Sequence, residues 1–265
     1  MPLKVTLVQA ALRWQDPAGN RTAFDATLGT IATGTTDLVV LPEMFTTGFA
    51  IDGSVPAEPS AGPTLEWLRG WAGRLDAAVT GSVATLDGGR RYNRLWFVAP
   101  DGSARHYDKR HLFRMAGEHE HFAPGSAGLV VSFRGWRIAP LVCYDLRFPV
   151  WSRRRPDYDY DLLLYVANWP ARRAFAWRQL LIARAIENQS YVAGVNRTGA
   201  DGKGIDYDGE SALHDFLGAP LAALGHDAAV TTVVLDEAAL AAFRERFPAH
   251  LDADRFELLS MERGA

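Results

Sequence analysis

The chain has 265 residues, of which 48% are hydrophobic and 22% are charged, a composition that is ordinary for a globular protein. The net charge of -3 at pH 7 argues against nucleic acid or an anionic membrane surface as a partner. The single cysteine cannot form an internal disulfide, and neither a secretion signal nor a membrane-spanning apolar run is visible. We therefore expect a cytoplasmic protein. Because no linker-like segment divides the chain, we expect residues 1–265 to form one domain.

The first part of the chain alternates predicted strands with predicted helices. Asn20 is suited to cap the first helix, which Gly34 would end. The second strand is a short, continuous apolar run, as expected where both faces of a sheet are covered. Residues 45–62 have the composition of a loop. The elements predicted here are strands at 4–9, 37–42, 78–83 and 94–99 and helices at 20–33 and 65–75.

The second part begins with residues 107–125, which show no clear period and are typical of a site loop. The predicted strands that follow include hairpins as well as strands joined by helices. This mixture predicts an α/β protein with mixed sheets. The strands at 37–42 and 161–167 both end beside polar residues, which suggests two similar halves. The elements predicted in this part are strands at 128–133, 136–142, 161–167, 190–196, 210–214, 220–224 and 229–235 and helices at 172–188 and 237–247.

Cys143, the only cysteine, ends the apolar run 136–142 and is followed by Tyr144 and Asp145 instead of further core residues. A buried structural thiol is the ordinary role of a free cysteine. A reactive thiol is the alternative, since a turn and a helix N-terminus after a strand would favour the thiolate. A nucleophilic thiol also needs a base, and none of the seven histidines lies in a recognisable protease signature.

Glu43 is a candidate for that base. It lies just beyond the apolar strand 37–42, at the edge where open α/β sheets bind their ligands. A solvated loop glutamate is the alternative, but Met44 and Phe45 follow directly and favour a half-buried carboxylate. Such a group suits general-base catalysis near neutral pH.

Lys109 lies in a basic cluster that could be an ordinary solvated surface. Its functional role would be a fixed positive charge that stabilises an oxyanion and lowers the pKa of a neighbouring thiol. Glu118 or Glu120 could supply a second carboxylate. Their alternation with His119 and His121 lacks the four-residue spacing of a helical zinc motif, so we expect no metal.

Together these patterns resemble the nitrilase superfamily of carbon–nitrogen hydrolases, which is known by a Glu–Lys–Cys triad in this chain order. The resemblance covers residues 5–235. The motifs that carry it are Leu41-Pro42-Glu43, Tyr107-Asp108-Lys109-Arg110-His111-Leu112-Phe113, Cys143-Tyr144-Asp145-Leu146-Arg147-Phe148-Pro149, Ala167-Asn168-Trp169-Pro170 and Arg184-Ala185-Ile186-Glu187-Asn188.

The resemblance implies a four-layer α-β-β-α sandwich with two mixed sheets, paired through its outer helices into a homodimer or a higher homo-oligomer. It implies that Glu43 is the base, that Cys143 attacks an amide carbonyl, and that a thioester forms. Lys109 and the backbone N–H of Tyr144 would hold the oxyanion. The family's second glutamate maps onto Glu118, with Glu120 close enough to take its place. No cofactor is implied.

The residues around these motifs are most similar to the omega-amidases, which hydrolyse the terminal amide of 2-oxoglutaramate or 2-oxosuccinamate. The far carboxylate of such a substrate needs a cation, for which Arg114 and Arg147 are candidates. Another amidase, a carbamoylase or a nitrilase of the same superfamily is the alternative, and an inactive binding module is an alternative of a different class. The aromatic and apolar residues that could line the pocket are Phe113, Met115, Tyr144 and Trp169.

Overall fold

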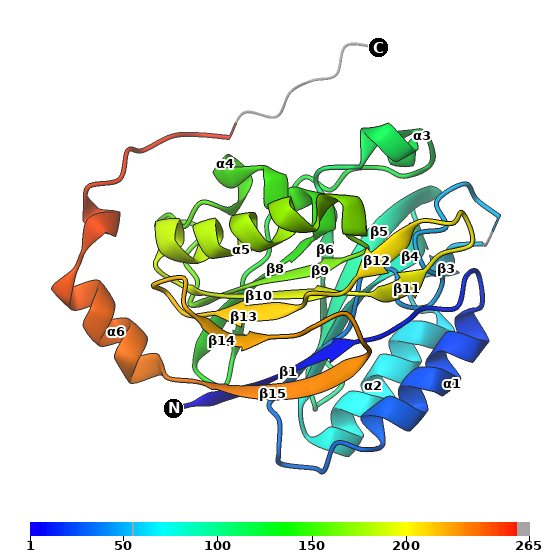
Figure 1. The fold of residues 1–265 in the computed structure, drawn as a ribbon, viewed down its shortest axis with the longest axis horizontal. Helices are drawn as coiled ribbons and strands as arrows, with labels where there is room; N and C mark the ends of the chain where they lie inside the picture. Colours follow the sequence, from blue (N-terminus) through cyan, green and yellow to red (C-terminus); the bar gives the residue numbers. More distant parts are fainter. Residues whose placement is uncertain (55, 259–265) are drawn as a thin grey trace.

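Two large mixed β-sheets lie face to face, with helices on the outer side of each (Figure 1). This arrangement is seen in a computed structural model that describes residues 1–54 and 56–258. It is the α/β fold with two mixed sheets in a four-layer α-β-β-α sandwich that the resemblance implies. None of the helices in the described ranges is long and apolar enough to cross a membrane.

The first sheet has seven strands in the order β15-β1-β2-β4-β5-β6, with the short β3 paired to β4. Strands β1, β2 and β4 are parallel to one another, whereas β15, β5 and β6 join antiparallel. The strands of this sheet are β1 (Leu3–Gln9), β2 (Leu38–Val40), β3 (Glu58–Pro59), β4 (Ala78–Asp87), β5 (Arg90–Val98), β6 (Ala104–Asp108) and β15 (Ala229–Leu235).

The second sheet has six strands in the order β14-β13-β10-β9-β8-β7. Its strands β8, β9 and β10 are parallel, and β7, β13 and β14 join antiparallel. The succession of parallel and antiparallel pairs is therefore the same as in the first sheet, with β8 in the place of β1 and β9 in the place of β2. The strands are β7 (Val131–Phe133), β8 (Trp136–Val142), β9 (Leu162–Ala167), β10 (Tyr191–Asn196), β13 (Ala212–His214) and β14 (Pro220–Ala223).

Helices α1 and α2 cover the outer face of the first sheet, and α5 covers that of the second (Figure 1). A small hairpin, β11 (Thr198–Ala200) and β12 (Asp206–Asp208), was not predicted. The α-helices are α1 (Pro17–Leu28), α2 (Pro63–Leu75), α3 (Glu118–His121), α4 (Pro149–Ser152), α5 (Ala174–Asn188) and α6 (Glu237–Arg246). The 3-10 helices are η1 (Arg114–Ala116), η2 (Cys143–Arg147), η3 (Ala171–Arg173) and η4 (Ala249–Leu251).

Strand β2 illustrates how the layers are held together. Its side chains point alternately to the two faces of the sheet, so Val40 packs between the sheets and Val39 packs under α1 and α2. Both side chains are fully buried, which explains why this part of the sequence is a continuous apolar run. Each such side chain contributes about 1.5–3 kcal/mol by leaving water.

The start of α1 differs from the prediction. The cap is Asp16, whose carboxylate accepts a hydrogen bond from Gly19 N, and Pro17 is the first helical residue. Asn20 is instead buried inside the helix, where its side chain bonds the backbone of Arg13 and Thr46. Asn20 therefore connects α1 to the two loops that contain Arg13 and Thr46.

Candidate active site

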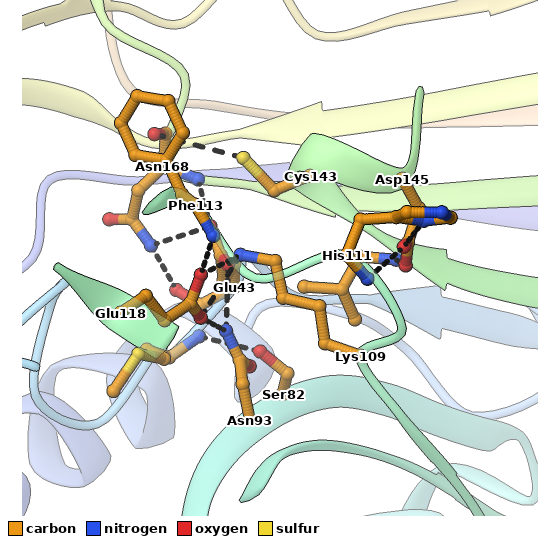
Figure 2. Close-up of polar contacts among 12 residues, drawn as sticks. Glu43, Ser82, Asn93, Lys109, His111, Phe113, Glu118, Cys143, Asp145 and Asn168 are labelled. Carbon is orange, nitrogen blue, oxygen red and sulfur yellow. Dashed lines mark hydrogen bonds and ion pairs between the residues drawn. The ribbon is translucent and has the colours of Figure 1, made fainter. Parts of the chain in front are cut away.

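The carboxyl ends of three parallel strands meet at one place in the sandwich. Glu43 follows β2 in the first sheet, while Cys143 and Asn168 follow β8 and β9 in the second. Lys109 comes from the segment after β6. The edge where parallel strands end is the usual ligand site of α/β sheets, and here two sheets contribute to it. Figure 2 shows the thiol of Cys143 next to the ends of Lys109 and Asn168.

The amine of Lys109 lies between two carboxylates. Its Nζ is 2.8 Å from Oε1 of Glu43 and 2.9 and 3.1 Å from the two oxygens of Glu118 (Figure 2). None of these three side chains is exposed to solvent. The ring of Phe49 lies 5.2 Å from Nζ and covers the amine on another side. Lys109 is therefore part of a buried ionic cluster and not of a surface patch.

Two asparagines complete the hydrogen bonds of Glu43. Asn93 Nδ2 donates to Oε1 at 2.8 Å, and the backbone N–H of Asn168 donates to Oε2 at 2.8 Å. Asn168 Nδ2 also donates to the backbone oxygen of Glu43 at 2.7 Å. Glu43 is fully buried, where the sequence predicted a half-buried carboxylate. Its orientation is fixed from three directions, by Lys109, Asn93 and Asn168.

Glu118, and not Glu120, is the carboxylate that contacts Lys109. Oε2 of Glu118 also accepts a hydrogen bond of 2.6 Å from Phe113 N, and its Oε1 accepts one from Asn93. Glu120 is exposed and has only His119 as an ionic neighbour, at 3.9 Å. Of the two carboxylates that the sequence left open, Glu118 is the one that lies in the buried cluster.

Cys143 is the first residue of η2 and has a left-handed backbone with φ of 44°. This conformation costs an L-residue roughly 1–2 kcal/mol and directs the side chain out of the strand into the cavity. The thiol is 8% exposed, and its Sγ lies 4.0 Å from the carbonyl oxygen of Asn168. The turn therefore presents a single reactive atom.

Burial and a neighbouring carboxylate favour the protonated thiol over the thiolate. Burial raises the pKa of Cys143 well above its ordinary value, the negative charge of Glu43 raises it further, and the positive charge of Lys109 opposes both. The sequence predicted that the following helix would favour the thiolate, but burial dominates. Such a thiol reacts only when a base removes its proton.

The charged state of Lys109 is strongly favoured in the cluster. Burial alone would lower the pKa of its amine, but the negative charges of Glu118 and Glu43 outweigh burial and raise the pKa above the usual value. Burial raises the pKa of Glu118, and the charge of Lys109 opposes that effect. The cluster therefore holds a permanent positive charge beside the thiol.

A small cavity, partly open to solvent, lies above Cys143, and the empty space in it together with the solvent at its mouth amounts to about 360 Å³. Phe113, Tyr144, Arg147 and Trp169 were predicted to line it and do so. Arg114 and Met115, predicted as well, are exposed and do not belong to its lining. They lie on η1, whose residues project to the surface. The residues lining the cavity are Phe49, Phe113, Cys143, Tyr144, Arg147, Asn168, Trp169, Pro170 and Arg173.

Two guanidinium groups face this cavity without an acidic partner. Arg147 lies over the ring of Trp169 at 4.9 Å, and Arg173 lies over that of Phe113 at 5.3 Å. Neither forms an ion pair with any residue that the structure describes. Burial lowers the pKa of Arg173, as do the charges of Arg172 and Arg147. An anion in the cavity would relieve this repulsion.

Sequence reasoning missed several residues of the site. Asn168 had a signal, because it follows the buried strand 161–167 just as Glu43 follows 37–42. Asn93 directly precedes the predicted strand 94–99 and had no signal of its own, and it is fully buried. Phe49 and Arg173 had no signal, since a loop aromatic and one arginine of an adjacent pair are both ordinary.

Within the described part of the chain, no group of three or more His, Cys, Asp or Glu side chains is arranged to hold a metal ion. The acidic groups nearest the thiol are instead occupied by Lys109 and the asparagines.

Comparison with known proteins identifies the family to which the chain belongs. The profile of the carbon-nitrogen hydrolase family matches residues 4–245. The chain is 53% identical to omega-amidase YafV of Yersinia enterocolitica, over 97% of this chain and 99% of that protein. It is 34% identical to 2-oxoglutaramate amidase of Bacillus subtilis, over 80% of this chain and 83% of that one.

Among solved structures, a CN-hydrolase superfamily protein of Xanthomonas campestris, with an arsenic adduct in its active site, superimposes with a TM-score of 0.95. That protein is 50% identical, and the alignment covers 97% of this chain and 99% of the other. Family profile, full-length relatives and fold agree. The chain belongs to the carbon–nitrogen hydrolase family, and the protein is a hydrolase of carbon–nitrogen bonds.

Proposed function

We propose that the protein hydrolyses the terminal amide of a short 2-oxo acid amide, 2-oxoglutaramate or 2-oxosuccinamate, to the 2-oxo diacid and ammonia. One observation carries the proposal. The thiol of Cys143 lines a cavity whose wall holds two guanidinium groups without an ion pair in the described part of the chain, and behind this lining a buried amine lies between two carboxylates. The similarity to an omega-amidase and to a 2-oxoglutaramate amidase supports the same substrate class.

Cys143 attacks first. Glu43 accepts the thiol proton, and the sulfur bonds to the carbonyl carbon of the amide. Negative charge develops on the carbonyl oxygen, where Nζ of Lys109 and the N–H of Tyr144 stabilise it. Tyr144 lies in the first turn of η2, whose N–H groups have no carbonyl partner inside the helix. The proton passes from Glu43 to the nitrogen, ammonia leaves, and a thioester remains on the sulfur.

Water completes the reaction. Glu43 accepts a proton from water, whose oxygen attacks the thioester carbonyl, and the same two donors hold the second oxyanion. The carbon–sulfur bond breaks, the carboxylic acid leaves, and the proton returns to the sulfur of Cys143. Glu118 holds the amine of Lys109 in place through both steps, since its two oxygens contact Nζ.

The wall of the cavity is suited to the remainder of the substrate. A guanidinium group binds a carboxylate with two parallel hydrogen bonds. Arg147 and Arg173 line the cavity and form no ion pair within the described part of the chain, and Nη2 of Arg173 contacts Sδ of Met115 at 2.9 Å. Phe113 and Trp169 lie under these groups and fix their planes. The distal carboxylate of a diacid monoamide then places its amide toward Cys143.

The test measures ammonia release from 2-oxoglutaramate, 2-oxosuccinamate, glutamine and a short nitrile by the wild type and by Cys143→Ala. We expect release from the 2-oxo acid amides by the wild type alone. Release from glutamine or the nitrile but not from the 2-oxo acid amides would point to another branch of the family. If the wild type released ammonia from none of the short amides, the proposed activity would be wrong and an inactive binding module would be the remaining interpretation.

We also propose that the protein is cytoplasmic and assembles as a homodimer or a larger homo-oligomer through its outer helices. Phe175 and Ile186 on α5 are 71% and 52% exposed, and apolar side chains of this size are suited to a subunit interface. Size-exclusion chromatography with light scattering should give a mass of at least two chains for the wild type. A monomer at micromolar concentration would contradict the proposed assembly.

A further inference from the structure

Asp145, two residues after the nucleophile, is a fully buried carboxylate that does not line the cavity. Its Oδ1 accepts hydrogen bonds from the backbone N–H of His111 at 2.9 Å and from Nδ1 of the same ring at 2.8 Å. Its Oδ2 accepts from the hydroxyl of Tyr107 at 2.8 Å and from Val142 N at 3.1 Å. An ionised carboxylate has about four acceptor positions, and all four are used.

The donors are placed symmetrically about the two reactive residues. Tyr107 and His111 stand two residues before and two residues after Lys109 in the chain. Val142 and Asp145 itself stand on either side of Cys143 and Tyr144. One carboxylate thus joins both flanks of the lysine segment to both flanks of the cysteine turn. The left side of Figure 2 shows Lys109 reaching the carboxylates, and the right side shows the bond between His111 and Asp145.

Neighbouring contacts hold the donors in turn. The hydroxyl of Tyr107 accepts hydrogen bonds from Trp151 Nε1 at 2.9 Å and from Arg110 N at 3.1 Å, so its own proton is directed to Asp145. The ring of His111 stacks on Phe148, with centroids 3.7 Å apart and planes within 5°. Phe148 directly follows η2. The turn that contains Cys143 is therefore held both by the hydrogen bonds of Asp145 and by the stacking of His111 on Phe148; we call these contacts the clamp.

We propose that Asp145 is a positioning residue that sets the geometry of Lys109 relative to Cys143 and Tyr144. The inference rests on the proposed catalytic roles of those three residues. Asp145 touches neither the cavity nor the reacting atoms, so it acts through them. A displacement of about 1 Å in such a constellation can cost on the order of 100-fold in rate.

An amide of the same shape does not fit these contacts equally well. Four groups of three residues contact Asp145, and all four donate when Nδ1 of His111 carries its proton, so an asparagine would direct its own two N–H groups at some of these donors. Asp145→Asn therefore breaks the clamp at constant volume. Asp161 offers a matched control, because it is also a buried carboxylate with several donors, Arg137 and Arg244, but lies at the opposite end of β9.

The first measurement compares kcat and KM of Asp145→Asn and Asp161→Asn with the wild type. For Asp145→Asn we expect kcat to fall by about 100-fold while KM changes by less than about threefold, since the cavity lining is intact. Asp161→Asn should lower the Tm at least as much, yet keep kcat within about threefold. Equal losses of kcat in both variants would reduce Asp145 to a structural residue and overturn the proposal.

The second measurement needs no substrate. The rate of Cys143 alkylation by iodoacetamide is followed against pH for the same proteins. If Lys109 moves away from the sulfur, the thiolate loses its nearest positive charge, and the profile of Asp145→Asn should shift to higher pH. An unshifted profile would contradict the clamp. Because alkylation is independent of turnover, an inactive wild type would refute the proposed function and leave this test valid.

Tyr107→Phe removes one donor and no volume, which keeps the proposal testable if Asp145→Asn does not fold. We expect kcat to fall by about 5- to 10-fold, with a smaller shift of the alkylation profile in the same direction. In the double variant Tyr107→Phe/Asp145→Asn the two losses of kcat should be less than additive, because both substitutions act on the carboxylate of Asp145. Wild-type kcat and an unchanged profile in Tyr107→Phe, or fully additive losses, would overturn the clamp.

Discussion

The ends of β8 and β1 occupy the same place in the strand order of their two sheets, yet they carry opposite kinds of residue. After β8 comes Cys143, with a left-handed backbone and a thiol facing the cavity. At the end of β1 is Gln9, which is 1% exposed. Its Nε2 donates to the carbonyls of Gly225 and Asp227, both at 2.7 Å, and its Oε1 accepts from Ser211 N at 2.9 Å.

The ends of β2 and β9 are equivalent in the same way, and they also carry different kinds of residue. Glu43 after β2 is an ionisable group, and Asn168 after β9 is the neutral amide that holds it. Strand order alone therefore does not make a strand end reactive. The difference lies in whether the polar group is saturated by its own chain, as in Gln9, or retains an atom for a ligand, as in Cys143.

The strongest test of this comparison is Glu43→Gln, which keeps the shape of the side chain and removes the proposed base. We expect kcat to fall by about 10⁴-fold, because burial raises the pKa of the Cys143 thiol and the variant lacks the carboxylate that we propose accepts its proton. Ammonia release and circular dichroism check rate and fold together. A fall of less than about tenfold would place the base elsewhere.

Among these variants, Lys109→Met should cause the second largest loss of kcat and the largest loss of stability. Loss of the amine removes an oxyanion donor, for which we expect kcat to fall by about 10³-fold. It also leaves the buried carboxylates of Glu43 and Glu118 without a cation, which should destabilise the fold by about 3–5 kcal/mol. Urea unfolding measures the second effect. Unchanged stability would show that the cluster adapts by taking up a proton.

Arg173→Met and Arg147→Met test the wall of the cavity. Each should raise KM for 2-oxoglutaramate by about 10- to 100-fold through the loss of a charged hydrogen-bonding partner, with a smaller change in kcat. Arg172→Met and Arg114→Met are the matched controls, since both side chains are exposed outside the lining. If Arg114→Met raised KM more than Arg173→Met did, the substrate carboxylate would bind at η1 and not at the wall of the cavity.

Gln9→Ala should lower stability and leave kcat nearly unchanged, the opposite of what we expect for Glu43→Gln. It removes three buried hydrogen bonds and leaves their partners unsatisfied, which should lower the free energy of unfolding by about 2–3 kcal/mol. The rate kcat should stay within about threefold of the wild type. If kcat fell as far as in Glu43→Gln, the equivalence between a structural and a reactive strand end would fail.

The smallest effect concerns alkaline pH. The folded pKa of Lys109 is raised by Glu118 and Glu43 against the effect of burial, so its contribution to stability is complete below the unfolded lysine pKa of about 10.4 and declines as pH rises above it. Unfolding at pH 9 and pH 11 should therefore bring the wild type closer to Lys109→Met by about 1 kcal/mol. A constant difference would contradict the raised pKa.

The sequence predicted those parts of the fold that depend on local pattern. The strand–helix alternation predicted an α/β protein with mixed sheets. The four-layer sandwich and the roles of Glu43, Lys109 and Cys143 came from the family resemblance that their motifs carry. What escaped prediction depends on long-range packing. Arg173 faces the cavity only because η3 turns it there, and Arg114 leaves it because η1 projects outward.

Burial was the other quantity that sequence could not give. Glu43 was expected to be half-buried, and Cys143 was expected to favour its thiolate, because each was judged by its immediate neighbours in the chain. The actual surroundings come from both sheets, which enclose Glu43 completely and raise the pKa of the thiol. Neighbours from another sheet leave no mark on a local sequence window.

The presence of a single cysteine in the chain has a practical consequence. Every equivalent of a thiol-specific reagent that the folded protein consumes reports one Cys143, without background from other positions. A fluorescent or mass label therefore counts the Cys143 centres of the purified protein directly, in a monomer as well as in an oligomer. If subunits in an assembly differed in reactivity, the stoichiometry of labelling would resolve them as a fraction of one label per chain.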